Sequence, residues 1–430
     1  MKRMLRAALV GVGILLATTS GQAQEKPAEL KIAMTTFLTG PASVFGIPAK
    51  AAAEILVEDI NAAGGVGGVK IKPVFIDEGV GTDRLLSEYR RVVQEEGVKV
   101  TLAAISSGNC NALAPVAEDL KVLNVLWDCA SEKLLEEHRY KYVVRTLGNG
   151  TSEIVATVMH LLRTKPDFKT LAIVNQDYAW GRDSRELFVN TLQAMKPDVK
   201  VVVEMYPKFG ASDFSSEISR LQALKPDVIL STSWGGDLDT LLRQASQRGL
   251  LRSATWVLPL GESSLERLGK ILPDGLIIGM RGEGYFLHPE YKDDAKHKAF
   301  VAKFRAKTGQ HPIYPVYHAA QAFQGVVDAY ATAMKANGGK WPTNEQLAET
   351  MRSLKFRALT RQVKMREDGQ GLADQMLGVT KMTPGQPFPV IDGLTIYPAE
   401  IVQNPVGTKS PEWVKTLKPD LLKDPRIKAY

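Results

Sequence analysis

Small polar residues follow two apolar segments in the first third of the chain. One group is Ser106–Asn109, and the other is Asp128–Ser131. If the apolar segments are parallel strands, both groups lie at one edge of a sheet, and the first opens a helix whose free N–H groups favour an anion. The two loops together could therefore hold a carboxylate. The alternative is that Ser107 or Asn109 only caps the helix.

Large aromatic residues lie in glycine-containing segments beyond residue 170. Tyr178 and Trp180 come just before a glycine, Trp234 precedes two glycines, and Tyr285 follows one. Rings in such loops can form flat apolar walls around a ligand. The alternative is that they pack between two parts of the protein. A nearby acid, Glu262, could accept a hydrogen bond from a ligand amine or hydroxyl, or could instead lie at a helix N-terminus.

Sequence patterns of common catalytic sites are absent. We find no GxxxxGK(S/T), HExxH or GxSxG pattern, and the six histidines are dispersed. The glycine-containing segment 279–284 does not have the spacing of a dinucleotide-binding loop. We therefore expect a binding protein that is not an enzyme and that needs no cofactor or metal. A secreted hydrolase with a scattered catalytic site is the alternative.

Charge and composition argue against a nucleic-acid partner. The chain has 430 residues, of which 44% are hydrophobic, and a formal charge of +7. Lys2, Arg3 and Arg6 supply part of that charge, and no run of five basic residues occurs anywhere. A protein that binds nucleic acid usually shows a concentrated basic patch. We therefore expect no nucleic acid as a partner.

The N-terminus has the pattern of an export signal. Met1–Arg6 is basic, Ala7–Ala17 is apolar, and Gly21 and Ala23 have the spacing that a signal peptidase reads. The apolar stretch is shorter than the ~20 residues of a membrane-spanning helix. We therefore predict a signal peptide of residues 1–23, export to the periplasm and a mature protein that does not span the membrane. A buried N-terminal helix is the alternative.

The chain has only two cysteines, Cys110 and Cys129. Each is expected just after one of two neighbouring strands, and such strand ends lie close together in a parallel sheet. Two cysteines in an oxidising compartment tend to pair, so we predict a disulfide. Two free buried thiols are the alternative.

Predicted strands and helices alternate along most of the chain, and the alternation restarts near residue 142. The strands are apolar runs, as expected for parallel strands that are covered on both faces. The pattern predicts the α/β fold class, with two doubly wound parallel-sheet lobes. Residues 351–356 and 363–365 should be strand or turn, and the proline-rich segment 384–430 should be irregular with a late short helix. The predicted strands are 30–36, 69–76, 98–105, 122–127, 142–145, 170–175, 199–205, 228–232, 255–258 and 276–280.

Several short motifs occur in order between residue 30 and about residue 371. They are Thr39-Gly40-Pro41 with Phe45-Gly46, Glu58 to Gly65, Ser106-Ser107, Val143 to Thr146, Asp177-Tyr178 with Gly181, and Leu242 to Ala245 before Gly249-Leu250. In these motifs the chain resembles the leucine/isoleucine/valine-binding protein family, the type I periplasmic solute-binding proteins of ABC transporters. The resemblance implies a monomer with two lobes, joined by a three-strand hinge, that close on a ligand.

The resemblance also implies the limits of the lobes. The three strands that connect the lobes would lie near Arg145-Thr146, Met280-Arg281 and Lys355–Leu359. Lobe 1 would then comprise residues 26–145 plus 282–355, and lobe 2 would comprise residues 146–281 plus 356–430.

The family's ligand contacts can be placed on this sequence. Its carboxylate-binding loops correspond to Ser107, Gly108 and the segment from Cys129 to Ser131, its covering aromatic to Phe45, and its amine-binding acid to a position near Glu262. With the aromatic residues above, the candidate ligand-binding residues are Phe45, Ser107, Gly108, Cys129, Ala130, Ser131, Tyr178, Trp180, Trp234, Glu262 and Tyr285.

The chain departs from the family in two loops. Many amino-acid-binding members carry a disulfide that begins in the loop after the second strand, but here that loop is Asp77–Gly81, without cysteine. Ser106–Asn109 also lacks the longer run of hydroxyl residues typical of branched-chain binders. We therefore expect the substrate-binding component of an ABC importer, which captures a small carboxylate, either an amino acid or an aromatic acid, for a membrane permease. A ligand-sensing receptor domain is the alternative function.

Overall fold

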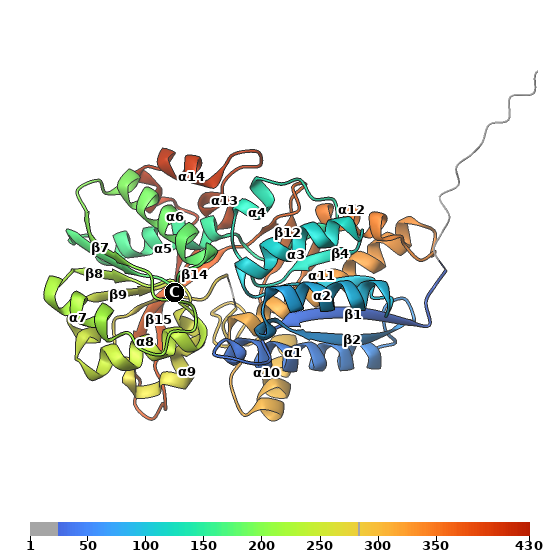
Figure 1. Ribbon diagram of the computed structural model, residues 1–430, viewed down its shortest axis with the longest axis horizontal. Coiled ribbons are helices and arrows are strands. Elements are labelled where there is room, and N and C mark those ends of the chain that lie inside the picture. The colour runs from blue at the N-terminus through green and yellow to red at the C-terminus, as the bar shows by residue number, and fades with distance from the viewer. Residues whose placement is uncertain (1–24, 283) are drawn as a thin grey trace, which may run out of the picture.

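The structure, a computed structural model, describes residues 25–282 and 284–430 and has two lobes side by side (Figure 1). The first lobe is built on a sheet with the strand order β2-β1-β3-β4-β5, in which all neighbouring strands are parallel. These strands are β1 (Glu29–Thr36), β2 (Lys70–Asp77), β3 (Val100–Leu102), β4 (Leu123–Leu126) and β5 (Val143–Arg145).

Helices cover both faces of this sheet, as the alternating pattern predicts. In α2, Leu85, Tyr89 and Val92 are buried because they recur at helical spacing and so share one face. The helices of the first lobe are α1 (Ser43–Ala62), α2 (Thr82–Gln94), α3 (Ser107–Asp119), α4 (Lys133–Glu136), α10 (Ala295–Thr308), α11 (Tyr314–Ala336) and α12 (Asn344–Ser353).

The second sheet contains the predicted parallel strands, and three antiparallel strands that the sequence analysis did not predict extend it. Its order is β16-β15-β14-β10-β9-β8-β6-β7. β6 to β10 run parallel. β14 pairs antiparallel with β10, β15 with β14, and β16 with β15. The strands are β6 (Thr170–Val174), β7 (Lys200–Met205), β8 (Val228–Leu230), β9 (Thr255–Leu258), β10 (Ile277–Gly279), β14 (Gln375–Lys381), β15 (Val390–Tyr397) and β16 (Lys428–Ala429). The helices are α5 (Gly150–Thr164), α6 (Ala179–Met195), α7 (Ser215–Leu224), α8 (Gly235–Gln247) and α9 (Leu265–Leu268).

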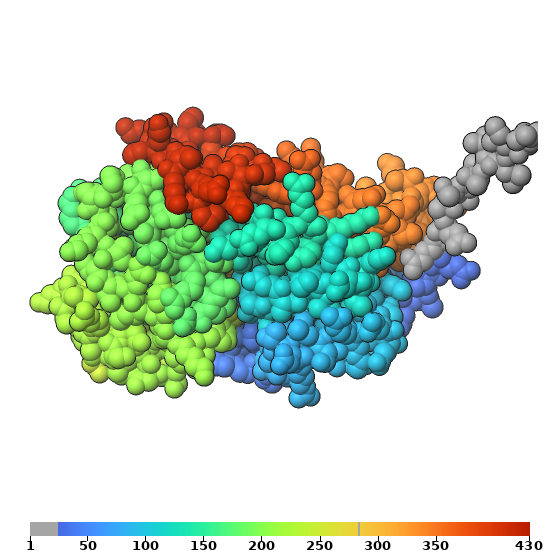
Figure 2. Space-filling model, turned by 45° about the horizontal axis from the view of Figure 1, so that its top comes forward, coloured from blue at the N-terminus to red at the C-terminus, as the bar shows by residue number. Residues whose placement is uncertain are grey.

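The C-terminal segment is more ordered than the prolines suggested. Residues 384–430 supply β15 and β16 as well as the short helices α13 (Ala399–Val402) and α14 (Ser410–Trp413), so the prediction of irregular structure was wrong. β15 forms because its β-branched residues suit a pleated surface and because β14 supplies the backbone partners. The segment lies over the second lobe and reaches the first, where Asn404 and Ser410 donate to Glu136 of α4 (Figure 2).

The last segment that connects the two lobes does not lead directly from residues 355–359 into the second sheet. β11 (Lys355–Arg357), β12 (Gln362–Met365) and β13 (Gly371–Leu372) form a separate antiparallel sheet, and the chain joins the second sheet only at Gln375. The lobe boundary that we expect at residue 355 therefore falls at the start of this small sheet. Met351 lies in α12 rather than in a strand, because a capping box of Thr343 and Gln346 starts a helix there.

The two cysteines form the predicted disulfide, with the Cα atoms of Cys110 and Cys129 6.6 Å apart. The predicted signal peptide, residues 1–23, lies outside the described residues. Within the described ranges, every helix is too short or too polar to cross a membrane.

Candidate ligand-binding site between the lobes

A cavity lies where the strand ends of the two sheets meet. It is partly open to solvent, and in this arrangement its free volume is about 10 Å³, room for about one water molecule. The first lobe contributes residues from α1, from the segments after β3 and β4, and from the start of α11. The second lobe contributes residues that follow β6, β8, β9 and β10. Ligands of open α/β sheets bind at such carboxyl ends of strands. The lining residues are Phe45, Ile105, Ser107, Asp128, Ala130, Tyr178, Trp180, Trp234, Leu260, Arg281 and Tyr314.

Aromatic rings from both lobes form the apolar walls. The ring centre of Phe45 lies 5.3 Å from that of Trp234 and 5.4 Å from that of Tyr314. Trp234 Nε1 donates to the Tyr178 hydroxyl at 2.5 Å, and Trp180 Nε1 donates to a backbone carbonyl after β8 at 3.1 Å. Because the protein itself satisfies both indole N–H groups, the two tryptophans offer a ligand their ring surfaces rather than donors.

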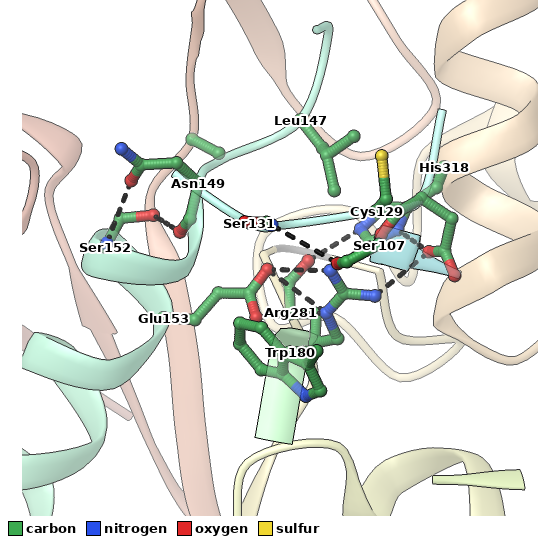
Figure 3. Close-up of polar contacts among 12 residues, drawn as sticks. Ser107, Cys129, Ser131, Leu147, Asn149, Ser152, Glu153, Trp180, Arg281 and His318 are labelled. Atoms are coloured by element: carbon green, nitrogen blue, oxygen red, sulfur yellow. Dashed lines mark hydrogen bonds and ion pairs between the residues drawn. The ribbon is translucent and has the colours of Figure 1, made fainter. Parts of the chain in front are cut away.

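Arg281 is a buried cation between the lobes (Figure 3). Its Nε lies 3.0 Å from Oε2 of Glu153 in α5, and its Nη1 lies 3.2 Å from Oδ1 of Asp128. The guanidinium lies 5.8 Å from the ring centre of Trp180 and 5.3 Å from that of Tyr314. Burial works to lower the pKa of Arg281, but the charges of Glu153 and Asp128 outweigh burial and raise that pKa above its usual value. Carboxylates from both lobes thus neutralise this cation.

His318 of α11 completes the charged cluster. Its Nδ1 lies 2.5 Å from Asp128 Oδ1, and its Nε2 lies 2.6 Å from the backbone oxygen of Arg281. The imidazole thus links Asp128 of the segment after β4 to the backbone of Arg281. Asp128 Oδ2 has no hydrogen-bond partner among the described residues.

A buried carboxylate from the end of β2 holds the loop before α3. Glu78 accepts hydrogen bonds from the backbone N–H of Ile105 at 2.9 Å, from that of Ser106 at 3.3 Å, and from Asn109 Nδ2 at 3.0 Å. Burial raises the pKa of Glu78 to about 7, although these hydrogen bonds work against the rise. No side chain caps α3. Asn109 binds Glu78 instead, and Ser107 faces the cavity.

A sequence model of the family described as "Periplasmic binding protein" matches residues 29–386, most of the chain. The chain belongs to this family. The leucine-, isoleucine-, valine-, threonine-, and alanine-binding protein of Pseudomonas aeruginosa is 26% identical over 328 residues, which are 73% of this chain and 84% of the relative. The leucine-specific-binding protein of Salmonella typhimurium is 24% identical over 345 residues, 80% of this chain and 87% of the relative. The predicted resemblance to leucine/isoleucine/valine-binding proteins is confirmed.

Solved structures of other periplasmic binding proteins share the fold. A solute-binding protein of an ABC transporter from Rhodopseudomonas palustris, in complex with 3,4-dihydroxybenzoic acid, has a TM-score of 0.75 at 19% identity and covers 89% of this chain and 100% of its own. A leucine-binding protein from Thermotoga maritima has a TM-score of 0.71 at 20% identity and covers 86% of this chain and 99% of its own. The predicted two-lobed α/β fold is therefore confirmed.

The cavity of this periplasmic binding protein brings together predicted residues from both lobes. It is lined by Phe45, Ser107, Ala130, Tyr178, Trp180 and Trp234. Five other predicted residues are not among its lining residues, and their part in ligand binding stays a prediction: Gly108, Cys129, Ser131, Glu262 and Tyr285.

Four of these five residues have other contacts in the structure. Cys129 is in the disulfide, and Ser131 Oγ donates to a carboxylate of α6 at 2.8 Å. Glu262 accepts the backbone N–H of Tyr314 at 2.9 Å, and burial raises its pKa to about 8. The Tyr285 hydroxyl accepts a backbone N–H of β15 at 3.2 Å. Glu262 therefore positions the start of α11, and nothing in the residues around Glu262 indicates this role.

Sequence reasoning did not select several residues that line the cavity. Asp128 belongs to the predicted carboxylate loop but was not selected as a ligand contact, and Arg281 was predicted only as part of a segment that connects the lobes. Tyr314 precedes a proline, a signal for a helix start but not for a ligand contact. Ile105 and Leu260 carry no polar signal at all.

Proposed function

We propose that this protein is the substrate-binding component of an ABC importer in the periplasm. In this proposal it captures a small carboxylate, an amino acid or an aromatic acid, by closure of the two lobes, and it does no chemistry on its ligand. The observation that carries the proposal is a single cavity with walls from both lobes, with Phe45 and Ser107 on one side and Trp180 and Trp234 on the other. A ligand that contacts both sides stabilises the closed arrangement.

The loop before α3 supports a carboxylate ligand. Ser107 Oγ accepts the backbone N–H of Ser131 at 3.4 Å, so its hydroxyl hydrogen remains available to donate. The first N–H groups of α3 have no partner within the helix, and the helix dipole favours negative charge there. Ala130 lies beside this position in the cavity wall. The aromatic walls then suit the apolar body of an amino acid or an aromatic acid.

Contacts outside the cavity support a closed arrangement of the lobes. Gly236 of α8 donates its backbone N–H to the carbonyl of Pro41 at 3.1 Å, and a Cβ at Gly236 would lie only 2.9 Å from that oxygen. On another side, Lys133 pairs with Asp183 at 2.7 Å and with Glu186 at 3.3 Å. These contacts would break if the lobes separated, so they belong to the closed form.

A thermal-shift screen tests the proposal. The mature protein is unfolded, freed of bound ligand, refolded and mixed with amino acids, aromatic acids, amides and sugars. A ligand at 100 times its Kd adds about 2.7 kcal/mol of stability, which is a shift of roughly 3 °C at this size. A shift with amino or aromatic acids alone supports the proposal, and a shift with sugars alone contradicts it.

An uptake assay tests the transport part of the proposal. Cells that lack this protein should lose uptake of the radiolabelled ligand found in the screen, and the intact gene should restore it. A Trp234→Ala gene should not restore uptake, whereas Trp413→Ala should, because Trp413 lies outside the cavity in α14. Normal uptake without the protein would contradict a role in import.

A further inference from the structure

Asp128 is the one acidic residue among those that line the cavity, and only one of its two carboxylate oxygens has hydrogen-bond partners in the described part of the chain. Asp128 is 1% exposed, and its Oδ1 accepts from both Arg281 and His318. Its Oδ2 is buried and has no hydrogen-bond partner in the described part of the chain. A buried carboxylate oxygen without a partner is unfavourable, so a ligand donor at Oδ2 would stabilise the closed form.

A second polar group lies on the same wall. The hydroxyl of Tyr314 is buried beside the guanidinium of Arg281, which can donate to the hydroxyl oxygen but cannot accept its hydrogen. The backbone N–H of Tyr314 is held by Glu262 at 2.9 Å, and its ring packs edge-on against Phe45. The guanidinium of Arg281 also contacts Asp128, so the two polar groups are neighbours of one cation. Tyr314 is therefore fixed in place with a hydroxyl hydrogen that no described residue accepts.

Asp128 and Tyr314 require different hydrogen-bonding groups on a ligand. Asp128 Oδ2 can only accept a hydrogen bond, whereas the Tyr314 hydroxyl can donate one. An ammonium group can satisfy Asp128 but cannot accept from Tyr314. A carboxylate can accept from Tyr314 but is repelled by Asp128. A ligand hydroxyl both donates and accepts through one oxygen, so it satisfies both groups at once.

We propose that Asp128 and Tyr314 determine specificity by selecting a hydroxyl group on the ligand, which is then a small hydroxylated carboxylic acid rather than an α-amino acid or an unsubstituted acid. This inference rests on the proposed function, since it assumes that the cavity binds a small carboxylate. The contacts of Asp128 agree with it. Its Oδ1 already accepts from Arg281, which also pairs with Glu153, so a cation is already present where an ammonium group would bind.

Matched ligand pairs test the inference by isothermal titration calorimetry on the mature protein. The pairs are 2-hydroxy-4-methylpentanoate with leucine, 3-phenyllactate with phenylalanine, and 4-hydroxybenzoate with benzoate. In the pair that fits the cavity, the hydroxylated acid should bind at least about tenfold more tightly, because the other member leaves a buried polar group unpaired. Equal binding, or tighter binding of the partner without the hydroxyl, would overturn the inference.

Two variants show whether the preference arises at these residues. Tyr314→Phe removes the hydroxyl alone and should reduce the preference to less than about threefold, since Phe cannot donate to the ligand. Asp128→Asn should do the same, and its folding is checked by circular dichroism because it also changes the partner of Arg281. Tyr330→Phe, in a buried position of the same helix away from the cavity, is the control and should keep the full preference. A preference that survives in Tyr314→Phe would overturn the inference.

The outcomes separate this inference from the proposed function. If the carboxylates bind without preference for a hydroxyl, the inference fails and the proposed function stands. If no member of any pair binds, and the thermal-shift screen also finds no carboxylate ligand, both fail.

Discussion

Loss of the disulfide between Cys110 and Cys129 should destabilise the protein by about 3 kcal/mol. The two cysteines are 19 residues apart, and the loop that they close contains α3 and β4. A cross-link lowers the chain entropy of the unfolded state, and for a loop of roughly 20 residues this entropy is ~11 cal/mol/K, or about 3 kcal/mol at 25 °C. Both residues are buried, so alanine is the better replacement, because serine would bury a hydroxyl without a partner.

Scanning calorimetry of the intact protein and of the Cys110→Ala/Cys129→Ala variant measures this loss. The unfolding entropy is ~2.1 cal/mol/K per residue, so the Tm should fall by about 4 °C if the whole mature chain unfolds together and by about 8 °C if the first lobe unfolds alone. Reductant should lower the Tm of the intact protein and leave that of the variant unchanged. A fall of less than ~1 °C would refute the reasoning, because it would show that the cross-link does not restrict the unfolded chain.

Three further perturbations address the site. Trp234→Ala should weaken ligand binding at least about tenfold, or about 1.4 kcal/mol, in titration calorimetry, whereas Trp413→Ala should not. Arg281→Met should reduce the free energy of unfolding by about 3–5 kcal/mol in urea titrations, because it leaves Glu153 buried without its cation. Burial raises the pKa of Glu78 to about 7 and that of Glu262 to about 8, above the ordinary value of 4.5. The stability should therefore fall as the pH rises from about 4.5 to about 8 and level off above that, and a Glu78→Gln/Glu262→Gln variant should show a flatter profile over the same range.

A specific result would contradict each of these three predictions. Unchanged affinity of Trp234→Ala would remove that ring from the ligand site. A stabilised Arg281→Met protein would show that the ion pairs cost more to bury than they return. The same pH profile for the intact protein and the Glu78→Gln/Glu262→Gln variant between pH 4.5 and pH 8 would mean that the two carboxyl groups are ionised without penalty, in conflict with their burial.

The part of the site that could be predicted from sequence lies directly after the strands. Ser107, Ala130, Tyr178 and Trp234 line the cavity because each follows a parallel strand within a few residues. Since the ends of parallel strands meet at one edge of a sheet, the position in the sequence was enough to place these residues near one another. The disulfide was predictable for the same reason.

The remaining residues depend on contacts between distant parts of the chain. Tyr314 reaches the cavity because α11 packs in the first lobe, and Glu262 accepts the backbone N–H of Tyr314. Arg281 enters through the crossing after β10, where it adopts the left-handed region with φ of 48°. β15 was missed because its pairing partner, β14, is antiparallel and supplies the context that the local sequence lacks. No local pattern encodes such contacts.

The position of Arg281 has a consequence for how the ligand controls closure. Its pairs with Asp128 and Glu153 join the two lobes without a ligand, yet burying such charges costs about as much as their attraction returns. The cluster alone therefore gives the closed form little net advantage over an open form in which water solvates the same groups. A ligand shifts this equilibrium only through contacts that exist in the closed form alone. The unpaired Oδ2 of Asp128 offers such a contact, because it is buried without a partner in this arrangement. If the proposed function holds, a ligand that donates to this oxygen should favour closure more than one that only fills the space between the aromatic walls.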